Sequence, residues 1–393
     1  MAGVFKTTVL SGSIEDSLAN KNFTGTMDAQ VRHPSGATNL GFGLSTLEDA
    51  EAGAENNTAL GVQALQELTT GDRNTAVGYG SLEDNTTADN STAVGYDALV
   101  LNNGGQNQAF GAFTLDANTS GVYNTAMGYA ALGANASGNY NVAIGGLSAL
   151  GACVSGVGNV AIGGSGALAS LDDGDYNVAI GYLAGEKIEG GSNNTLVGRW
   201  AGSKIVDPDF NTCIGYASGD EITTGTLNTT IGFNAGSNVT TGNYNTLIGR
   251  AATASAAGVN NEITLGSANV TALRCQRTSI SALSDARDKD EIQDLSLGLD
   301  YIQQVRPVEF VWQMRDGAVT DKKDFGFIAQ EMMAVEDAND AEWVSSVLRN
   351  NPERLEVAPA QLLPIAIKAI QELSAQLDEL KAKVGSCKCQ GGK

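Results

Sequence analysis

The sequence contains a single histidine, His33, among 393 residues. A Ser-His-Asp or Cys-His catalytic arrangement needs a histidine in the repeats or the C-terminal third, and neither region has one. A metal site with two histidine ligands from one chain is excluded for the same reason. Basic residues are also scarce, because 23 Lys and Arg face 44 Asp and Glu, for a net charge of −21. We therefore expect no nucleic-acid partner, since such a partner requires a basic surface.

Cysteines are few, and long apolar runs are missing. The five cysteines are too irregularly spaced for a disulfide framework; they are Cys153, Cys213, Cys275, Cys387 and Cys389. Free thiols are expected, and metal binding or crosslinking by the Cys387-Lys388-Cys389 tail is the alternative. No run is long enough for a transmembrane helix, and the first residues lack the pattern of a secretion signal. The sequence predicts a protein made in a cytoplasm, without cofactor or membrane insertion.

Proline is nearly absent between Asn39 and Thr253, where only Pro208 occurs, whereas the chain holds 49 glycines. In this region the phrase N-T-A-V-G-Y-x-A-L recurs thirteen times, at intervals of 16 to 18 residues. A fixed period this short predicts a solenoid, in which each coil packs only against its neighbours. The glycines of the phrase are Gly43, Gly61, Gly78, Gly95, Gly111, Gly128, Gly145, Gly163, Gly181, Gly198, Gly215, Gly232 and Gly249.

Each phrase has the two-residue period of a β-strand, as in Asn74 to Tyr79. Its third position is usually alanine (Ala76, for example) and its fourth is a larger apolar residue (Val77, for example), so these two columns lie on opposite faces. We expect the larger column to line the core and the small column to permit a close neighbour. The leading asparagine of each phrase is expected to bond to turn backbone and to stack into a ladder.

The phrase resembles the head repeats of trimeric autotransporter adhesins, whose consensus is N-x-V-A-I-G. That resemblance covers residues 39–253 and implies a left-handed parallel β-roll with three chains side by side. The period here is longer than that family's usual one, and neither a secretion signal nor a membrane anchor is evident. A mainly β solenoid stalk over residues 39–270 is therefore predicted, and an intertwined triple-stranded fibre is left open.

The last third of the chain, residues 271–393, is richer in charge and aromatic residues. A helical pattern is predicted for Ser281 to Ile292, and the later segments include G-F-I-A-Q-E at 326–331 and L-L-P-x-x-x-K-A-I-Q-E-L at 362–373. With S-D-x-R-x-K at 284–289, these motifs resemble the intramolecular chaperone domain of bacteriophage endosialidases, tail spikes and tail fibres. The resemblance covers about residues 280–384. It implies an α+β domain that trimerises, assembles the stalk before it and then cuts itself off.

By position, the resemblance makes Ser284 the cleavage serine and Lys289 its dyad partner, with the cut at the Leu283–Ser284 bond. A lysine that is desolvated in a folded trimer loses its proton near neutral pH and serves as the base for the serine hydroxyl. The alternative is structural: Ser284 as a helix N-cap with Asp285 in the first turn, and Lys289 as a solvated charge.

The last helix supports oligomerisation independently of any resemblance. Spacings of three and four residues form the a/d seam of a coiled coil. The seam consists of Leu363, Ala366, Ile370, Leu373, Leu377, Leu380 and Val384. An amphipathic helix packed on its own domain is the alternative.

These features predict a homotrimeric bacteriophage fibre, located in the virion, that contacts a host surface receptor or glycan. Residues 1–38 are expected to attach it to other virion proteins. Arg199-Trp200 and Tyr244 are candidate contact residues, because exposed aromatic and charged groups at turns commonly bind partners. The alternative is that these residues only cover a face of their coil. A glycan depolymerase and a purely structural spacer are the alternatives, although no paired carboxylates mark a glycosidase site.

Overall fold

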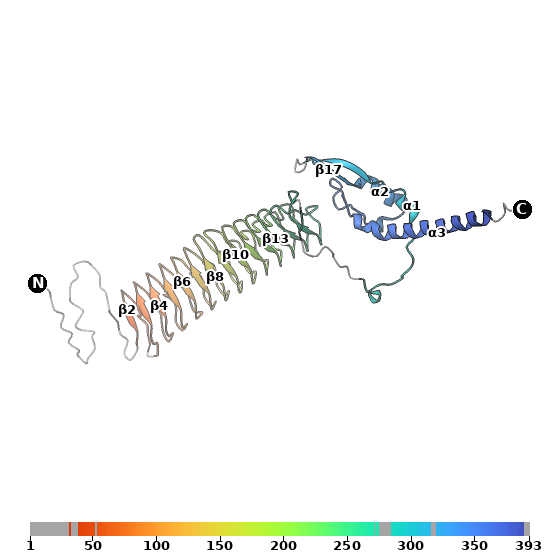
Figure 1. Cartoon of the computed structure of the whole chain (residues 1–393). Helices are drawn as coiled ribbons and strands as arrows, with labels where there is room; N and C mark the ends of the chain where they lie inside the picture. Colours follow the sequence, from red (N-terminus) through yellow and green to blue (C-terminus); the bar gives the residue numbers. More distant parts are fainter. Residues whose placement is uncertain are drawn as a thin grey trace. The chain divides into compact units, whose positions relative to one another are not determined.

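The structure is a computed structural model that describes residues 31–32, 38–51, 53–270, 272–274, 284–315 and 320–388. The chain divides into two compact units, Met1–Leu265 and Gly266–Lys393, each with its own core (Figure 1). Most of residues 1–38, including His33, lies outside the described residues, as do Cys275, Leu283 and Cys389.

The first unit is a stack of three-residue strands, and each strand pairs in parallel with the next along the chain (Figure 1). The pairing follows the repeat, so that Ala76 lies opposite Ala93. Because each neighbour comes from the same chain, the predicted solenoid is confirmed and an intertwined triple-stranded fold is not what forms. The strands are β2 (Leu40–Phe42), β3 (Thr58–Leu60), β4 (Thr75–Val77), β5 (Thr92–Val94), β6 (Gln108–Phe110), β7 (Thr125–Met127), β8 (Val142–Ile144), β9 (Val160–Ile162), β10 (Val178–Ile180), β11 (Thr195–Val197), β12 (Thr212–Ile214), β13 (Thr229–Ile231), β14 (Thr246–Ile248) and β15 (Ile263–Leu265). A short antiparallel strand, β1 (Val31–Arg32), pairs with β2.

The alanine column points into the solenoid, and the larger column points out. Ala126 is completely buried, whereas the next residue, Met127, is 45% exposed. Our expectation for these two columns is therefore wrong. The reason is the narrow interior: the turn that follows each strand from β2 to β9 inserts its own leucine, such as Leu132, into the core. A small residue on the strand leaves room for that leucine.

From β11 onward, the strand position and the turn position that face each other across the core exchange large and small residues. The strand centre becomes larger, as in Leu196 and Cys213, and the facing turn position becomes glycine. A Cβ on Gly202 would lie 2.8 Å from Leu196 Cδ2, and one on Gly219 would lie 2.5 Å from Cys213 Sγ. The exchange keeps the width of the core constant, as close packing requires.

The two described cysteines of the solenoid are buried free thiols. Burial raises the pKa of Cys153 to about 11 and that of Cys213 to about 12. Both thiols therefore stay protonated at neutral pH and act as small apolar core residues. The side chains of Cys387 and Cys389 lie outside the described residues, so the tail prediction stays a prediction.

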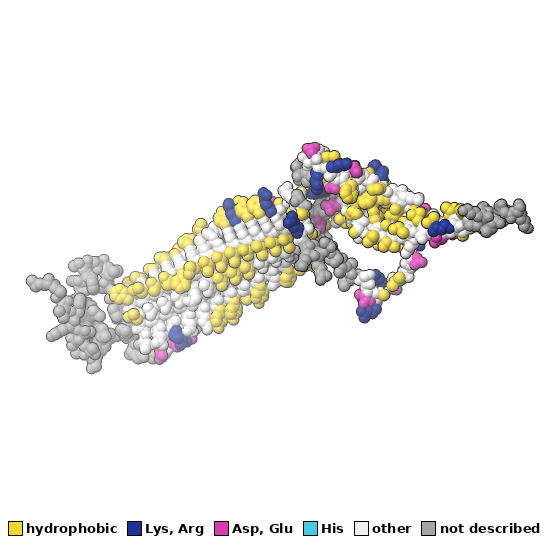
Figure 2. All heavy atoms as spheres, viewed as in Figure 1, with side chains coloured by type: hydrophobic (Ala, Val, Ile, Leu, Met, Phe, Trp, Pro, Cys, Tyr) yellow, Lys and Arg dark blue, Asp and Glu magenta, His cyan; other side chains and the backbone are white. Residues whose placement is uncertain are grey.

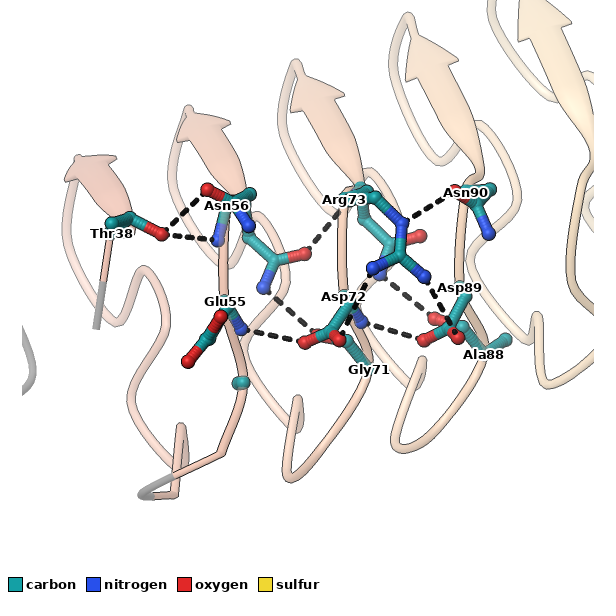
Figure 3. Close-up of polar contacts among 12 residues, drawn as sticks. Thr38, Glu55, Asn56, Gly71, Asp72, Arg73, Ala88, Asp89 and Asn90 are labelled. Carbon is teal, nitrogen blue, oxygen red and sulfur yellow. Dashed lines mark hydrogen bonds and ion pairs between the residues drawn. The ribbon is translucent and has the colours of Figure 1, made fainter. Parts of the chain in front are cut away.

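The leading asparagines form the predicted ladder through the core. The amide oxygen accepts the backbone N–H of the equivalent residue in the next coil, usually an asparagine, as from Asn74 N to Asn57 Oδ1 at 2.8 Å. Each amide nitrogen donates to a turn carbonyl of the following coil, as from Asn57 Nδ2 to Gly71 O at 2.9 Å. Figure 3 shows this region, where a second polar column runs beside the ladder. In it, Asp72 accepts the backbone N–H of Glu55 and Asp89 accepts that of Asp72, both at 2.7 Å.

The glycine after each strand is required by close contact between coils. A Cβ on Gly128 would lie 1.7 Å from the carbonyl oxygen of Gly145 in the next coil. Gly128 also has a φ of +128°, a conformation that only glycine adopts readily. The repeated glycine is thus a steric requirement of stacking.

The second unit is a small α+β domain. Its helices are α1 (Leu299–Ile302), α2 (Ala329–Ala338) and α3 (Leu362–Lys388), and its short 3-10 turns are η2 (Ala286–Asp288), η3 (Glu342–Val344) and η4 (Pro359–Gln361). Its strands form two antiparallel pairs, β16 (Val308–Gln313) with β17 (Thr320–Gly326) and β18 (Val347–Leu348) with β19 (Glu356–Val357). Tyr301, Met332 and Ile365 lie in its core.

The helical prediction for Ser281 to Ile292 is wrong for the described part. Only η2 is helical there, and the residues around it are irregular and exposed. Asp288, Asp290 and Glu291 crowd negative charge into a segment with no buried residue, so no core contact rewards helix formation.

Helix α3 has two apolar faces with different environments. Leu362, Ile365 and Ala369 are buried against the domain core. The predicted seam lies on another face, where Ile370 and Leu377 are 66% and 51% exposed. Packing on its own domain therefore does not consume the seam. No described helix is long and apolar enough to span a membrane.

Candidate functional site

The segment from Ser284 to Lys289 folds back on itself through the η2 turn. Asp285 is the N-cap: its Oδ1 accepts the backbone N–H of Arg287 at 2.9 Å, and its carboxylate also pairs with the Arg287 guanidinium. These bonds hold the pKa of Asp285 below its usual range. Asp285, and not Ser284, is the cap, so the structural role considered for Ser284 is taken by its neighbour.

The turn brings Ser284 and Lys289 into direct contact. Lys289 Nζ donates a hydrogen bond to Ser284 Oγ at 2.6 Å, across five positions of sequence. The Lys289 backbone N–H also closes the turn on Ala286 O at 3.3 Å. A nucleophile and a base within hydrogen-bond reach are the first geometric requirement of covalent catalysis. Both side chains are exposed in the single chain.

A shallow groove of about 500 Å³ lies beside the lysine, lined by Lys289, Asp290, Ile292, Leu295 and Trp343. Ile292 and Trp343 are 71% and 63% exposed, which is unusual for such large apolar side chains. A chain covering these residues would remove water from around Lys289, and desolvation favours the neutral amine.

Two groups of charged residues, which the sequence did not reveal, link elements of the C-terminal domain. Arg306 Nε donates to Glu331 Oε2 at 2.9 Å, which lowers the pKa of Glu331 and ties the G-F-I-A-Q-E motif to the start of β16. Glu336 is fully buried and accepts bonds from Ser346 and Arg349. The sequence pattern that could have revealed Glu336 is its position four residues after Met332, which places both residues on the same face of α2.

The candidate contact residues Arg199 and Trp200 belong to an exposed ridge of the solenoid. The Arg199 guanidinium lies 3.9 Å from the Trp200 ring centroid, and the rings continue through Tyr216 to Phe233 at centroid distances of 5.4 and 5.2 Å. Arg250 lies over Phe233 at the far end. Among the described residues, neither Arg199 nor Arg250 has a carboxylate in ion-pair contact. Tyr244 is 58% exposed on a separate column.

An acidic cluster lies nearer the N-terminal end of the same unit. Burial, followed by the charges of Asp84, Asp97 and Glu67, raises the pKa of Glu83. Burial likewise raises the pKa of Asp97. The adjacent Tyr96 stacks on Tyr79 with ring centroids 5.2 Å apart. Carboxyl groups with raised pKa are candidates for acid or base roles, and glycosidases use a pair of carboxyl groups.

Comparison with protein-family models matches residues 284–343 to the family described as chaperone of endosialidase. Neither the comparison with curated proteins nor that with solved structures yields a match. The matched segment begins at Ser284 and includes two of the three motifs named above, S-D-x-R-x-K and G-F-I-A-Q-E. The chain therefore carries an endosialidase-type chaperone domain behind a β-solenoid of about 17-residue repeats, a combination that fits a tail fibre.

Proposed function

We propose that this protein is a bacteriophage virion fibre: a homotrimer whose solenoid stalk contacts the host surface and whose C-terminal domain directs assembly and then cleaves itself off. The observation that carries the proposal is the 2.6 Å contact between Lys289 Nζ and Ser284 Oγ, at the first residue of the chaperone match. Residues 1–38 would attach the fibre to other virion proteins.

The exposed seam of α3 supports self-assembly. Leu363, Ile370, Leu377 and Val384 recur every seven residues and are each at least 51% exposed. Such a heptad seam buries its apolar residues only when helices of other chains pack against it. The family match supports a trimer, whereas the seam alone does not fix the number of chains.

The cleavage chemistry is an acyl shift followed by hydrolysis. Ser284 Oγ attacks the carbonyl carbon of Leu283 while Lys289, as a neutral amine, takes the hydroxyl proton. The peptide C–N bond breaks and the nitrogen is protonated, which leaves an ester between Leu283 and Ser284 Oγ. Water then hydrolyses this ester to the Leu283 carboxylate and restores the hydroxyl. Because Lys289 is exposed in the single chain, we expect assembly to precede cleavage.

Substitution of Ser284 by alanine is expected to abolish cleavage, because the attacking oxygen is removed. Lys289→Met should do the same by removing the base. The measurement is a denaturing gel with intact mass: the wild type should give a released fragment of residues 284–393, and Ser296→Ala, which changes a nearby exposed serine, should cleave like the wild type. A wild type that stays uncut as a trimer would refute the dyad and leave the assembly role standing.

The ridge at Arg199–Arg250 supports contact with an anionic glycan. Exposed rings offer faces for sugar rings, and two guanidiniums that have no carboxylate partner among the described residues offer charge to acid groups. These arginines are exceptional, because the chain as a whole carries a net charge of −21. The acidic cluster around Glu83 favours a second candidate function, a depolymerase.

Reversal of both ridge charges, Arg199→Glu with Arg250→Glu, is expected to weaken binding to anionic host polysaccharide by about tenfold or more. Binding of the purified trimer to immobilised glycan measures this. A matched control is Lys187→Glu, an exposed lysine of the same unit without an ion pair among described residues. Unchanged binding by the double variant would exclude the ridge. Release of soluble oligosaccharide would favour the depolymerase.

A further inference from the structure

The outward face of the solenoid sheet carries no charge. In strands β2–β15, all of them described, the first and third residues face outward, and every one is Thr, Gln, Val, Ile, Leu, Phe or Met. The third position is apolar in every strand, and Leu60, Met127 and Ile248 are 47%, 45% and 39% exposed. Figure 2 shows hydrophobic side chains gathered into stripes along this unit.

This composition contrasts with the rest of the coil. The acidic residues of the solenoid lie at turns, as Asp72, Asp89 and Asp97 do, and Arg199 and Arg250 lie on the ridge that follows the glycine column. If this face were in contact with water in the assembled protein, we would expect it to carry acidic residues as the rest of the solenoid surface does. An uncharged strip with a continuous apolar column over the full length of the stack indicates an interaction surface.

We propose that this face is the subunit interface of the stalk, buried against the same face of other copies of this chain, parallel and in register. The partner is a second copy of the chain, because its apolar side chains repeat at the same spacing along the stack. Each coil can therefore pack against the equivalent coil of the other copy. The strip measures about 65 Å by about 10 Å at ordinary strand spacing. That area is of the order of 600 Å² per chain, close to the half-interface of a stable complex.

This inference rests on the proposed self-cleavage, because cleavage creates the need for an interface within the stalk. Cleavage at Leu283–Ser284 removes residues 284–393, and the α3 seam leaves with them. Helix α3 can then no longer hold the stalk together. The mature trimer needs a second interface within the solenoid, and the uncharged strand face has the length and polarity that such an interface requires.

The test uses the full chain and the stalk purified after cleavage. Ile214→Lys with Ile231→Lys places two charges on the face, and Thr224→Lys with Thr241→Lys places the same charges on exposed turns of adjacent coils. We expect the cleaved stalk to remain trimeric by light scattering in the wild type and the turn variant, and to fall to monomers in the face variant. A trimeric face variant would overturn the inference.

A crosslink separates this inference from the assembly proposal. Thr229→Cys and Ile231→Cys, made singly with Cys387 and Cys389 changed to serine, should each be tested for disulfide-linked dimers on oxidation of the uncut Ser284→Ala chain. In at least one of these two variants, most chains should form a disulfide-linked dimer. In the Thr241→Cys variant, no chains should do so. A trimer in which neither face cysteine crosslinks would refute the interface alone, whereas a monomeric uncut chain would refute the proposed assembly itself.

Discussion

Substitution of Asn177 by alanine is expected to destabilise the solenoid by about 3 to 5 kcal/mol. Asn177 is fully buried and makes bonds in both directions along the ladder. Its Oδ1 accepts the backbone N–H of Asn194 at 3.0 Å, and its Nδ2 donates to Gly191 O at 2.7 Å. Alanine leaves both of these buried backbone groups without a partner and adds a cavity. Hydrogen exchange should show the loss of protection first in the coils beside residue 177.

The ladder itself provides a milder substitution for comparison. Ser91 stands in place of one asparagine, and there Asn107 Nδ2 donates to both Gly104 O and Gly121 O, at 2.8 and 2.7 Å. A neighbouring amide thus covers the carbonyl that serine cannot reach. We expect Asn177→Ser to cost less than alanine, and Thr224→Ala, an exposed turn change, to cost almost nothing. Equal melting of the alanine and turn variants would show that the ladder adds no stability.

Substitution of Gly128 by alanine is expected to cost about 3 kcal/mol or more, or to prevent the two adjacent coils from stacking. The new methyl group would lie 1.7 Å from Gly145 O, an atom of the backbone that cannot move without breaking its own coil. The φ of +128° adds strain for any residue with a Cβ. Urea unfolding, followed by exchange measurements on β7 and β8, measures both effects.

A glycine without these constraints is the control. A Cβ at Gly164 would meet nothing within 4 Å, so Gly164→Ala should be neutral or stabilise the fold by about 0.5 kcal/mol through a less flexible unfolded chain. If Gly128→Ala and Gly164→Ala unfold alike, the glycine column is not required for stacking.

Periodicity could predict much of this fold because it is a one-dimensional property. The spacing of Gly61, Gly78 and Gly95 and the asparagines before each strand are visible as letters, and each coil repeats the same local solution. The domain change near residue 270, the α3 seam and the Ser284–Lys289 pair were likewise visible as motifs. The contact between Ser284 and Lys289 required the η2 turn, which the sequence suggested wrongly as a longer helix.

The repeats and motifs by themselves determined that this protein is a β-solenoid followed by a small domain whose last helix carries a heptad seam. Tertiary structure alone decided which side of each strand is the inside. Alternation shows that Ala126 and Met127 face opposite ways, yet both are apolar, so composition cannot choose between them. The choice depends on Leu132, which enters the same interior from another wall and leaves room only for a methyl group opposite it.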